Sequence, residues 1–75
     1  MMYSRRRCGL CDEAREVIEE VRAGLPAPFR FEEVFIEGDL SLEREYGLRV
    51  PVVKVGGVEQ FEIAVDPVRL RELVL

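Results

Sequence analysis

Residues 3–21 read YSRRRCGLCDEAREVIEEV, a stretch that places both cysteines of the chain, Cys8 and Cys11, directly ahead of a helical pattern. At 100° per residue, the apolar side chains after Gly9 fall on one stripe and the charged ones on the remaining faces. The stretch therefore predicts an amphipathic helix from about Gly9 to Ala23, with a Cys-x-x-Cys motif at its start. The apolar stripe consists of Leu10, Ala14, Val17, Ile18, Val21 and Leu25.

One strand is predicted before this helix, and a second strand and a short helix are predicted after it. Met1–Ser4 is consistent with a short strand, and Phe29–Ile36 (FRFEEVFI) is rich in the aromatic and β-branched residues that strands favour. The second of these has apolar side chains on both faces, which is typical of a strand covered on both sides. Leu40–Tyr46 offers about two helical turns before Gly47.

The last third of the chain predicts a hairpin followed by a helix. Val50–Val55 (VPVVKV) is an apolar strand, and Gly56-Gly57 can supply the positive φ angles of a tight turn. Val58–Ile63 then returns antiparallel to it. Asp66-Pro67 is a helix start, since Asp caps free amides and Pro is favoured in the first turn. We expect this helix to be mostly apolar on its inner side, with Val68, Leu70, Leu73, Val74 and Leu75.

The predicted order is strand, helix, strand, short helix, strand, hairpin strand, helix, within a single domain spanning residues 1–75. A right-handed crossover makes the first two strands parallel, and the Gly-Gly hairpin makes the last two antiparallel. The sequence thus predicts an α/β fold: a mixed four-stranded sheet with helices on both faces.

Composition narrows the possible functions. A net charge of −4 argues against general nucleic-acid binding, and no segment approaches the roughly 18 apolar residues that span a membrane. MMYSRRR has no apolar stretch after its charges, unlike a secretory signal, so we expect a cytoplasmic protein. Two cysteines in that compartment are more often catalytic or metal-binding than a structural disulfide. The absence of His excludes Cys-His dyads, Ser-His-Asp triads and Cys/His zinc sites within one chain.

The helix phase assigns different roles to the two sulfurs. Residues three apart on a helical turn bring their α-carbons near the window of roughly 4.4–6.8 Å that a disulfide needs. Cys11 lies at the edge of the apolar stripe, whereas Cys8 lies further round and at the amino end, where free amides favour a thiolate. We therefore predict Cys8 as the nucleophile and a half-buried Cys11 as the resolving thiol.

Charged neighbours act on Cys8 in opposite directions. Arg5–Arg7 would stabilise its thiolate, and Asp12 and Glu13 would disfavour it, although acidic residues also suit the first turn of a helix. Among the three arginines we select Arg7, which adjoins the nucleophile, as a substrate-binding residue. The alternative for each arginine is a solvated surface charge.

Other readings of the pair remain open at this point. Free cysteines often act as small buried hydrophobes, without redox chemistry. A structural zinc site wants four ligands, so metal binding would need two chains sharing their pairs, as would a bridging iron–sulfur cluster. The third alternative is a non-catalytic binding module with ordinary thiols.

The sequence resembles glutaredoxin-like members of the thioredoxin superfamily along nearly its whole length. YSRRRCGLCDEAREVIEEV is similar to their opening, and EYGLRVPVVKVGG to their second motif. The resemblance implies a thioredoxin-like fold and a thiol–disulfide oxidoreductase that reduces disulfides through a Cys8/Cys11 dithiol, with no cofactor. It also implies that Pro51 is cis and lies against the cysteines, and that the backbone around Val50 pairs with an extended substrate.

Departures from the family pattern bear on the partners. Typical glutaredoxins have a Gly-rich, Asp-containing turn before the last helix that holds glutathione, whereas this chain has Ile63-Ala64-Val65-Asp66-Pro67. This departure counts against glutathione as the physiological reductant, and it makes Asp66 a helix cap. The chain is most similar to short bacterial glutaredoxin-like proteins ending in an Asp-Pro-x-x-Leu helix. We expect a monomer that acts on a disulfide-containing protein or a low-molecular-weight thiol substrate and draws electrons from a thiol donor.

Overall fold

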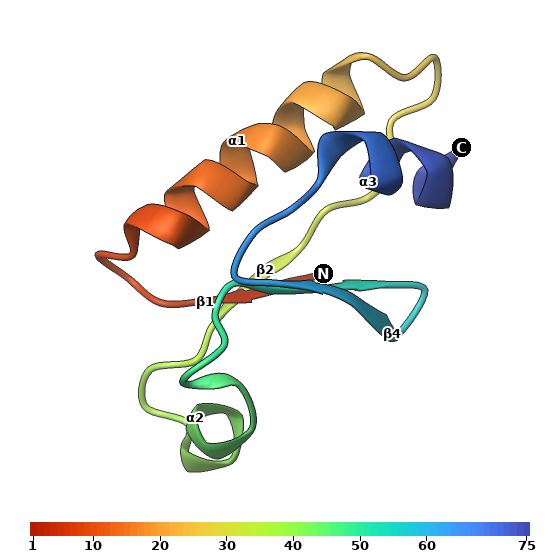
Figure 1. Cartoon of the computed structure of the whole chain (residues 1–75). Helices are drawn as coiled ribbons and strands as arrows, with labels where there is room; N and C mark the ends of the chain where they lie inside the picture. The colour runs from red at the N-terminus through yellow and green to blue at the C-terminus, as the bar shows by residue number, and fades with distance from the viewer.

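The computed structural model describes residues 1–75, which form one four-stranded sheet and three helices (Figure 1). The strands are β1 (Met2–Ser4), β2 (Glu33–Phe35), β3 (Val52–Val55) and β4 (Val58–Glu62). The helices are α1 (Gly9–Ala23), α2 (Leu40–Tyr46) and α3 (Pro67–Val74). They follow one another in the predicted order, β1-α1-β2-α2-β3-β4-α3. The sheet order is β2-β1-β3-β4. Strand β1 pairs parallel to β2 and antiparallel to β3, and β3 pairs antiparallel to β4. The predicted mixed α/β sheet is confirmed.

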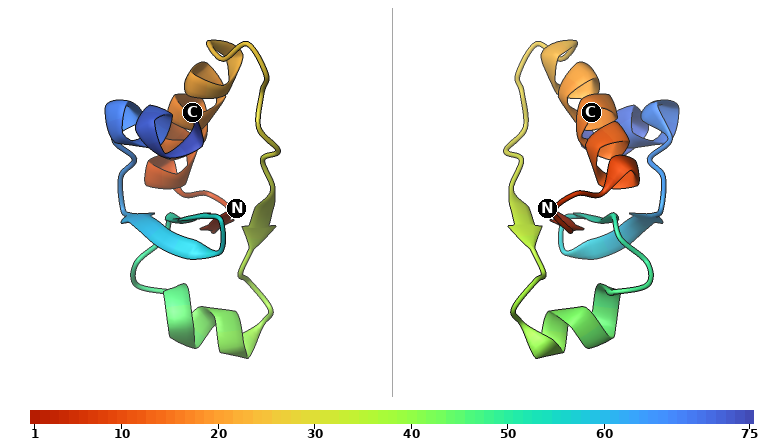
Figure 2. Two further views of the ribbon diagram at one scale, coloured as in Figure 1. Left: turned by 90° about the vertical axis from the view of Figure 1, so that its right-hand side faces the viewer. Right: turned by 90° about the vertical axis from the view of Figure 1, so that its left-hand side faces the viewer.

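Helices cover both faces of this sheet: α1 and α3 lie on one side and α2 on the other (Figure 2). Because side chains alternate along a strand, neighbouring residues enter different cores. Met2 and Val53 pack with Ile18 and Leu70 beneath α1 and α3. Tyr3 and Val52 turn to the opposite face, where the smaller cluster beneath α2 consists of Ile36, Tyr46 and Val52, with Tyr3, Leu42 and Val50 packed against it.

The second predicted strand is too long. The prediction covered residues 29–36, but β2 is only Glu33–Phe35, because β1 offers just three residues for pairing. Phe29 and Phe31 lie ahead of the strand and pack against the larger core. Phe35 is exposed, with the Arg6 guanidinium 4.8 Å from its ring centre.

The hairpin and the last helix also differ from the prediction in detail. Strand β3 begins at Val52, after Pro51, which lacks a backbone donor. A bulge between Val53 and Lys54 shifts the pairing with β4, which ends before Ile63. In α3 only one side meets the core, so Leu70 is buried whereas Val68 and Leu75 are exposed. No helix of the chain is long and apolar enough to cross a membrane.

Candidate functional site: the Cys8–Cys11 pair

The two cysteines lie across the first turn of α1. Cys8 is the N-cap residue, with extended backbone angles, and its Sγ accepts a hydrogen bond of 3.1 Å from the Cys11 N–H. The α-carbons are 5.2 Å apart and the sulfurs are at disulfide distance. An N-cap normally uses an oxygen for this role, so here the sulfur replaces the Ser or Asp side chain. The helix start and the sulfur chemistry are therefore provided by the same residue.

Their exposure differs in the predicted direction. Cys11 is fully buried, on the same side of α1 as Ala14 and Ile18, whereas Cys8 is partly exposed. Cys11 is thus more buried than the half-buried position that the helix phase predicted, in line with the buried Ala14 and Ile18 along α1. Of the two cysteines, only Cys8 is in contact with solvent.

The three arginines before Cys8 have separate environments. Arg5 forms an ion pair of 2.7 Å with Glu43 and donates to the Gly47 carbonyl. The Arg6 backbone N–H donates to Glu37, and its guanidinium covers Phe35. Arg7 is exposed, has a left-handed φ of 55°, and makes no ion pair or side-chain hydrogen bond. Arg7 is thus the one free cation of this run, and it adjoins the nucleophile candidate.

The Val50-Pro51 peptide bond is cis, as the resemblance implied. Tyr3 pairs with Val52 in the antiparallel register of β1 and β3, so the next position puts Pro51 opposite Ser4, where β1 leads into the cysteine loop. The Pro51 carbonyl accepts from the Ile63 N–H at 2.8 Å, whereas the backbone N–H and C=O of Val50 make no hydrogen bond within the chain. The fold therefore brings an unpaired stretch of backbone to the same end of the sheet as the cysteines.

A charged network that sequence reasoning missed joins α1 to the sheet at this end. Arg15 donates two hydrogen bonds to Glu33, from Nε to Oε1 at 2.8 Å and from Nη2 to Oε2 at 2.6 Å. The buried Ser4 donates to Glu33 at 2.6 Å, and Arg15 also binds Asp12. The Arg15 hydrogen bonds lower the pKa of Glu33, and those same contacts raise the pKa of Arg15. The i, i+3 spacing of Asp12 and Arg15 was the only local signal for this network.

The start of α3 is closed by its own residues. The Asp66 carboxylate accepts from the Val68 N–H at 3.0 Å, which confirms the predicted cap, and Pro67 contributes no amide. In the segment before it, the Ile63 and Ala64 amides donate to the carbonyls of Pro51 and Glu62. No group of three or more His, Cys, Asp or Glu side chains is arranged to hold a metal ion.

Comparison with known proteins identifies the family. The chain matches the glutaredoxin-like domain (DUF836) over residues 1–75. It belongs to this family. The X-ray structure of the X. campestris protein XcR50 is 41% identical and superposes with a TM-score of 0.77, covering 95% of this chain and 88% of that one. Its solution structure gives 0.74 at 41% identity, covering 95% and 85%. No curated protein sequence matches the chain.

The family and the geometry agree on a thioredoxin-like redox fold. A glutaredoxin-like domain with Cys8 and Cys11 at disulfide distance fits that class. The resemblance seen in the sequence is thereby confirmed at the level of family and fold.

Proposed function

We propose that this glutaredoxin-like protein is a thiol–disulfide oxidoreductase, with Cys8 as the attacking thiolate and Cys11 as the resolving thiol. The observation that carries the proposal is the unequal pair at the start of α1: two cysteines with their sulfurs at disulfide distance, one partly exposed and one buried. A pair of structural hydrophobes would not need the exposed member at a helix N-cap. A reactive pair does, because only the exposed sulfur can meet a substrate.

The reaction transfers two electrons and balances without a cofactor. The Cys8 thiolate attacks one sulfur of the target disulfide, whose S–S bond breaks, and the departing thiolate takes up a proton. Cys11 then loses its proton and attacks Cys8 Sγ in the mixed disulfide. This step releases the second substrate sulfur as a thiol and leaves the Cys8–Cys11 disulfide. A thiol donor returns this disulfide to the dithiol.

Two features favour the thiolate form of Cys8. The Cys11 N–H points at its sulfur, and the remaining free amides of the first turn carry the positive end of the helix dipole. The unpaired Arg7 guanidinium adds a full positive charge one residue away. Arg5 and Arg6 contribute less, because Glu43 and Glu37 offset their charges. Arg7 is therefore our candidate for both thiolate stabilisation and contact with substrate.

Substrate binding is assigned to the backbone of Val50 beside Pro51. Its unpaired N–H and C=O can pair with an extended segment of a disulfide-containing partner, as in other cases of strand addition. Buried backbone groups without hydrogen-bond partners are unfavourable. A bound chain that pairs with the Val50 N–H and C=O would replace the hydrogen bonds that water otherwise makes to them. We propose a protein disulfide or a low-molecular-weight thiol disulfide as the substrate.

The electron donor is proposed to be a thiol other than glutathione. The segment that would hold its γ-glutamyl end is occupied by apolar side chains, and the amides of Ile63 and Ala64 are already bonded. The Asp66 carboxylate already accepts from the Val68 N–H as the cap of α3, and Pro67 offers no amide there.

The test compares the reduced parent with Cys8→Ser and Cys11→Ser in the reduction of bis(2-hydroxyethyl) disulfide. With dithiothreitol as the donor the parent turns over and Cys8→Ser does not. In a single reaction without a donor, Cys11→Ser stops at a mixed disulfide visible as a mass increase. Equal behaviour of all three proteins would contradict the proposal and favour a non-catalytic binding module.

A further inference from the structure

A small apolar pocket of about 110 Å³ lies between the first half of α1 and the segment joining β4 to α3. Its walls come from two parts of the chain that are distant in sequence, and six of its seven lining residues are hydrophobic. The lining residues are Leu10, Glu13, Ala14, Val17, Ile63, Ala64 and Val65. None of the roles assigned above uses this pocket.

The pocket adjoins both halves of the candidate site. Leu10 stands between the two cysteines in the chain, and its side chain is 46% exposed. Ile63, 40% exposed, donates its N–H to the Pro51 carbonyl, so it stands directly beside the strand-pairing backbone. Ile63 has a left-handed φ of 71°, which is unfavourable for a β-branched residue. The pocket lining is therefore continuous with the cysteine turn through Leu10 and with the Pro51 backbone through Ile63.

The chemistry of the lining selects its occupant. Glu13 is the only charged lining residue, and it makes no ion pair. No cation lines the pocket, and the Ile63 and Ala64 amides are bonded within the chain, so a carboxylate would meet neither a counter-charge nor these two donors. An apolar side chain would bury surface against Leu10, Val17 and Val65 instead.

We propose that this pocket binds an apolar side chain of a protein substrate, which makes extended segments with an aliphatic residue near the disulfide cysteine the preferred substrates. The inference rests on the proposed function. The occupant follows from continuity with the unpaired Val50 backbone and from charge, because Glu13 favours neutral or basic residues around the apolar anchor. Successive side chains of an extended segment face opposite ways, so one position of the substrate, and not its neighbours, enters the pocket.

The test uses short peptides whose single cysteine carries a 2-thiopyridyl leaving group. The reduced protein attacks the peptide sulfur and releases pyridine-2-thione, so the leaving group is identical throughout and rate differences report the peptide. Leu and Asp are placed in turn at the two positions on each side of the cysteine. Reaction with 2,2′-dipyridyl disulfide, which has no peptide, measures the thiol chemistry alone.

The expected result is a rate about tenfold higher for Leu than for Asp at one position, the scale on which apolar pockets discriminate. Ala64→Leu fills the pocket mouth and brings this ratio close to one, whereas the matched control Ala23→Leu, at the exposed far end of α1, keeps it. Glu13→Arg, a second surface variant, lowers the ratio by accelerating the Asp peptides.

Three outcomes would overturn the inference. The first is equal rates for Leu and Asp at every position while 2,2′-dipyridyl disulfide still reacts, which leaves the proposed function intact. The second is a Leu preference that survives both Ala64→Leu and Glu13→Arg. The third is a faster reaction with glutathione that carries the same 2-thiopyridyl leaving group than with any Leu peptide. A protein that fails to react with 2,2′-dipyridyl disulfide contradicts the proposed function itself, and the inference falls with it.

Discussion

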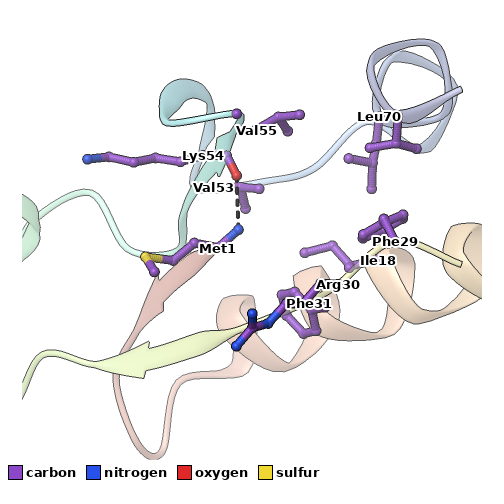
Figure 3. Close-up of a pocket in the computed structure, with 11 residues that line it drawn as sticks. Met1, Ile18, Phe29, Arg30, Phe31, Val53, Lys54, Val55 and Leu70 are labelled. Carbon is purple, nitrogen blue, oxygen red and sulfur yellow. Dashed lines mark hydrogen bonds between the residues drawn. The ribbon is translucent and has the colours of Figure 1, made fainter.

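Helix α1 borders two apolar hollows, one along its first half and one at Ile18 toward its other end, and the two differ in what surrounds them. The pocket near the helix start, about 110 Å³, is lined by Leu10, between the two cysteines, and by Ile63, which donates to the Pro51 carbonyl. The hollow at the other end is larger, about 180 Å³ (Figure 3). Ile18, Val53 and Leu70 contact it from α1, β3 and α3, and all three belong to the larger core cluster.

This difference shows that, in a domain of this length, the size of a hollow does not indicate where the functional site lies. A 75-residue chain has too few side chains to fill every gap at the end of its sheet, so the larger hollow is a property of core packing. Neither cysteine lines it. The smaller pocket is lined by Leu10, which stands between the two cysteines, and by Ile63, which donates to the Pro51 carbonyl. The following changes test this division between a reactive end of α1, at Leu10, and a structural end, toward Ile18.

The largest effect is expected from Ile18→Ala at the structural end. Ile18 is buried, and large-to-small changes of this kind lower the free energy of unfolding by roughly 2–5 kcal/mol. Urea unfolding measures this loss, and Ile18→Val, with an expected loss of about 0.5–1.5 kcal/mol, serves if the first variant does not fold. The rate with 2,2′-dipyridyl disulfide in native buffer should match the parent. A slower rate in a folded variant would show that the two ends are coupled.

Glu33→Gln tests the charged network at the reactive end. A carboxyl whose pKa is lower in the folded than in the unfolded chain stabilises the fold at neutral pH, and this stabilisation is lost as the pH falls through the lowered pKa. The pKa of Glu33 is held below its usual value of 4.5 by Arg15. We expect the variant to lose on the order of 1–2 kcal/mol at pH 7, and the difference from the parent to shrink below pH 4.5.

The matched control for this network is Glu32→Gln. Glu32 pairs with the exposed Arg30 on the surface, where ion pairs contribute little. Its unfolding free energy should stay within about 0.5 kcal/mol of the parent at every pH. A pH profile of Glu33→Gln that parallels the parent down to pH 3 would mean that Glu33 is not the titrating group.

Arg7→Glu should change reactivity and leave stability nearly untouched. The side chain is exposed and makes no ion pair, so the unfolding free energy should shift by less than about 0.5 kcal/mol. Reversal of the charge beside Cys8 disfavours its thiolate, and alkylation by iodoacetamide at neutral pH should slow by about threefold or more. Arg44→Glu, an equally unpaired arginine in α2, is the control. If both variants slow alkylation equally, net charge rather than Arg7 sets the rate.

The smallest effect is expected from filling the structural end. Val74 is half-buried at the edge of the larger hollow, and Val74→Leu adds one methylene there. Cavity-filling changes commonly contribute about 0.5–2 kcal/mol, and we expect the lower end of that range. The thermal midpoint should rise by a few degrees, about 4–8 °C per kcal/mol in a domain of this size, with the peptide preference unchanged. If Val74→Leu abolished the Leu preference, the substrate side chain would bind in the larger hollow and not in the pocket near the helix start.

Much of the reactive end could be predicted from the sequence because its features depend on residues that are close together in the chain. The helical period from Gly9 to Ala23 separates an inner from an outer cysteine within one turn. Asp66-Pro67 predicts its own cap, since the carboxylate reaches an amide two residues on. The cis Val50-Pro51 bond followed only from family resemblance.

What the sequence missed depends on partners that are distant along the chain. Residues 29–36 have the composition of a strand, yet β2 stops where β1 has no more backbone to pair with it. Glu33 lies 18 positions from Arg15 and 29 positions from Ser4 in the sequence, so no local pattern predicts their network.

By itself the sequence determined the helices, the turn and the inequality of the two thiols, because these depend on periodicity and on contacts within a turn. Only the tertiary structure decided which arginine stays free. Arg5 and Arg6 meet Glu43 and Glu37 from other parts of the chain, and Arg7, on a left-handed backbone, meets neither. It also brought Ile63 beside Leu10, which turns two exposed apolar residues into the walls of one pocket.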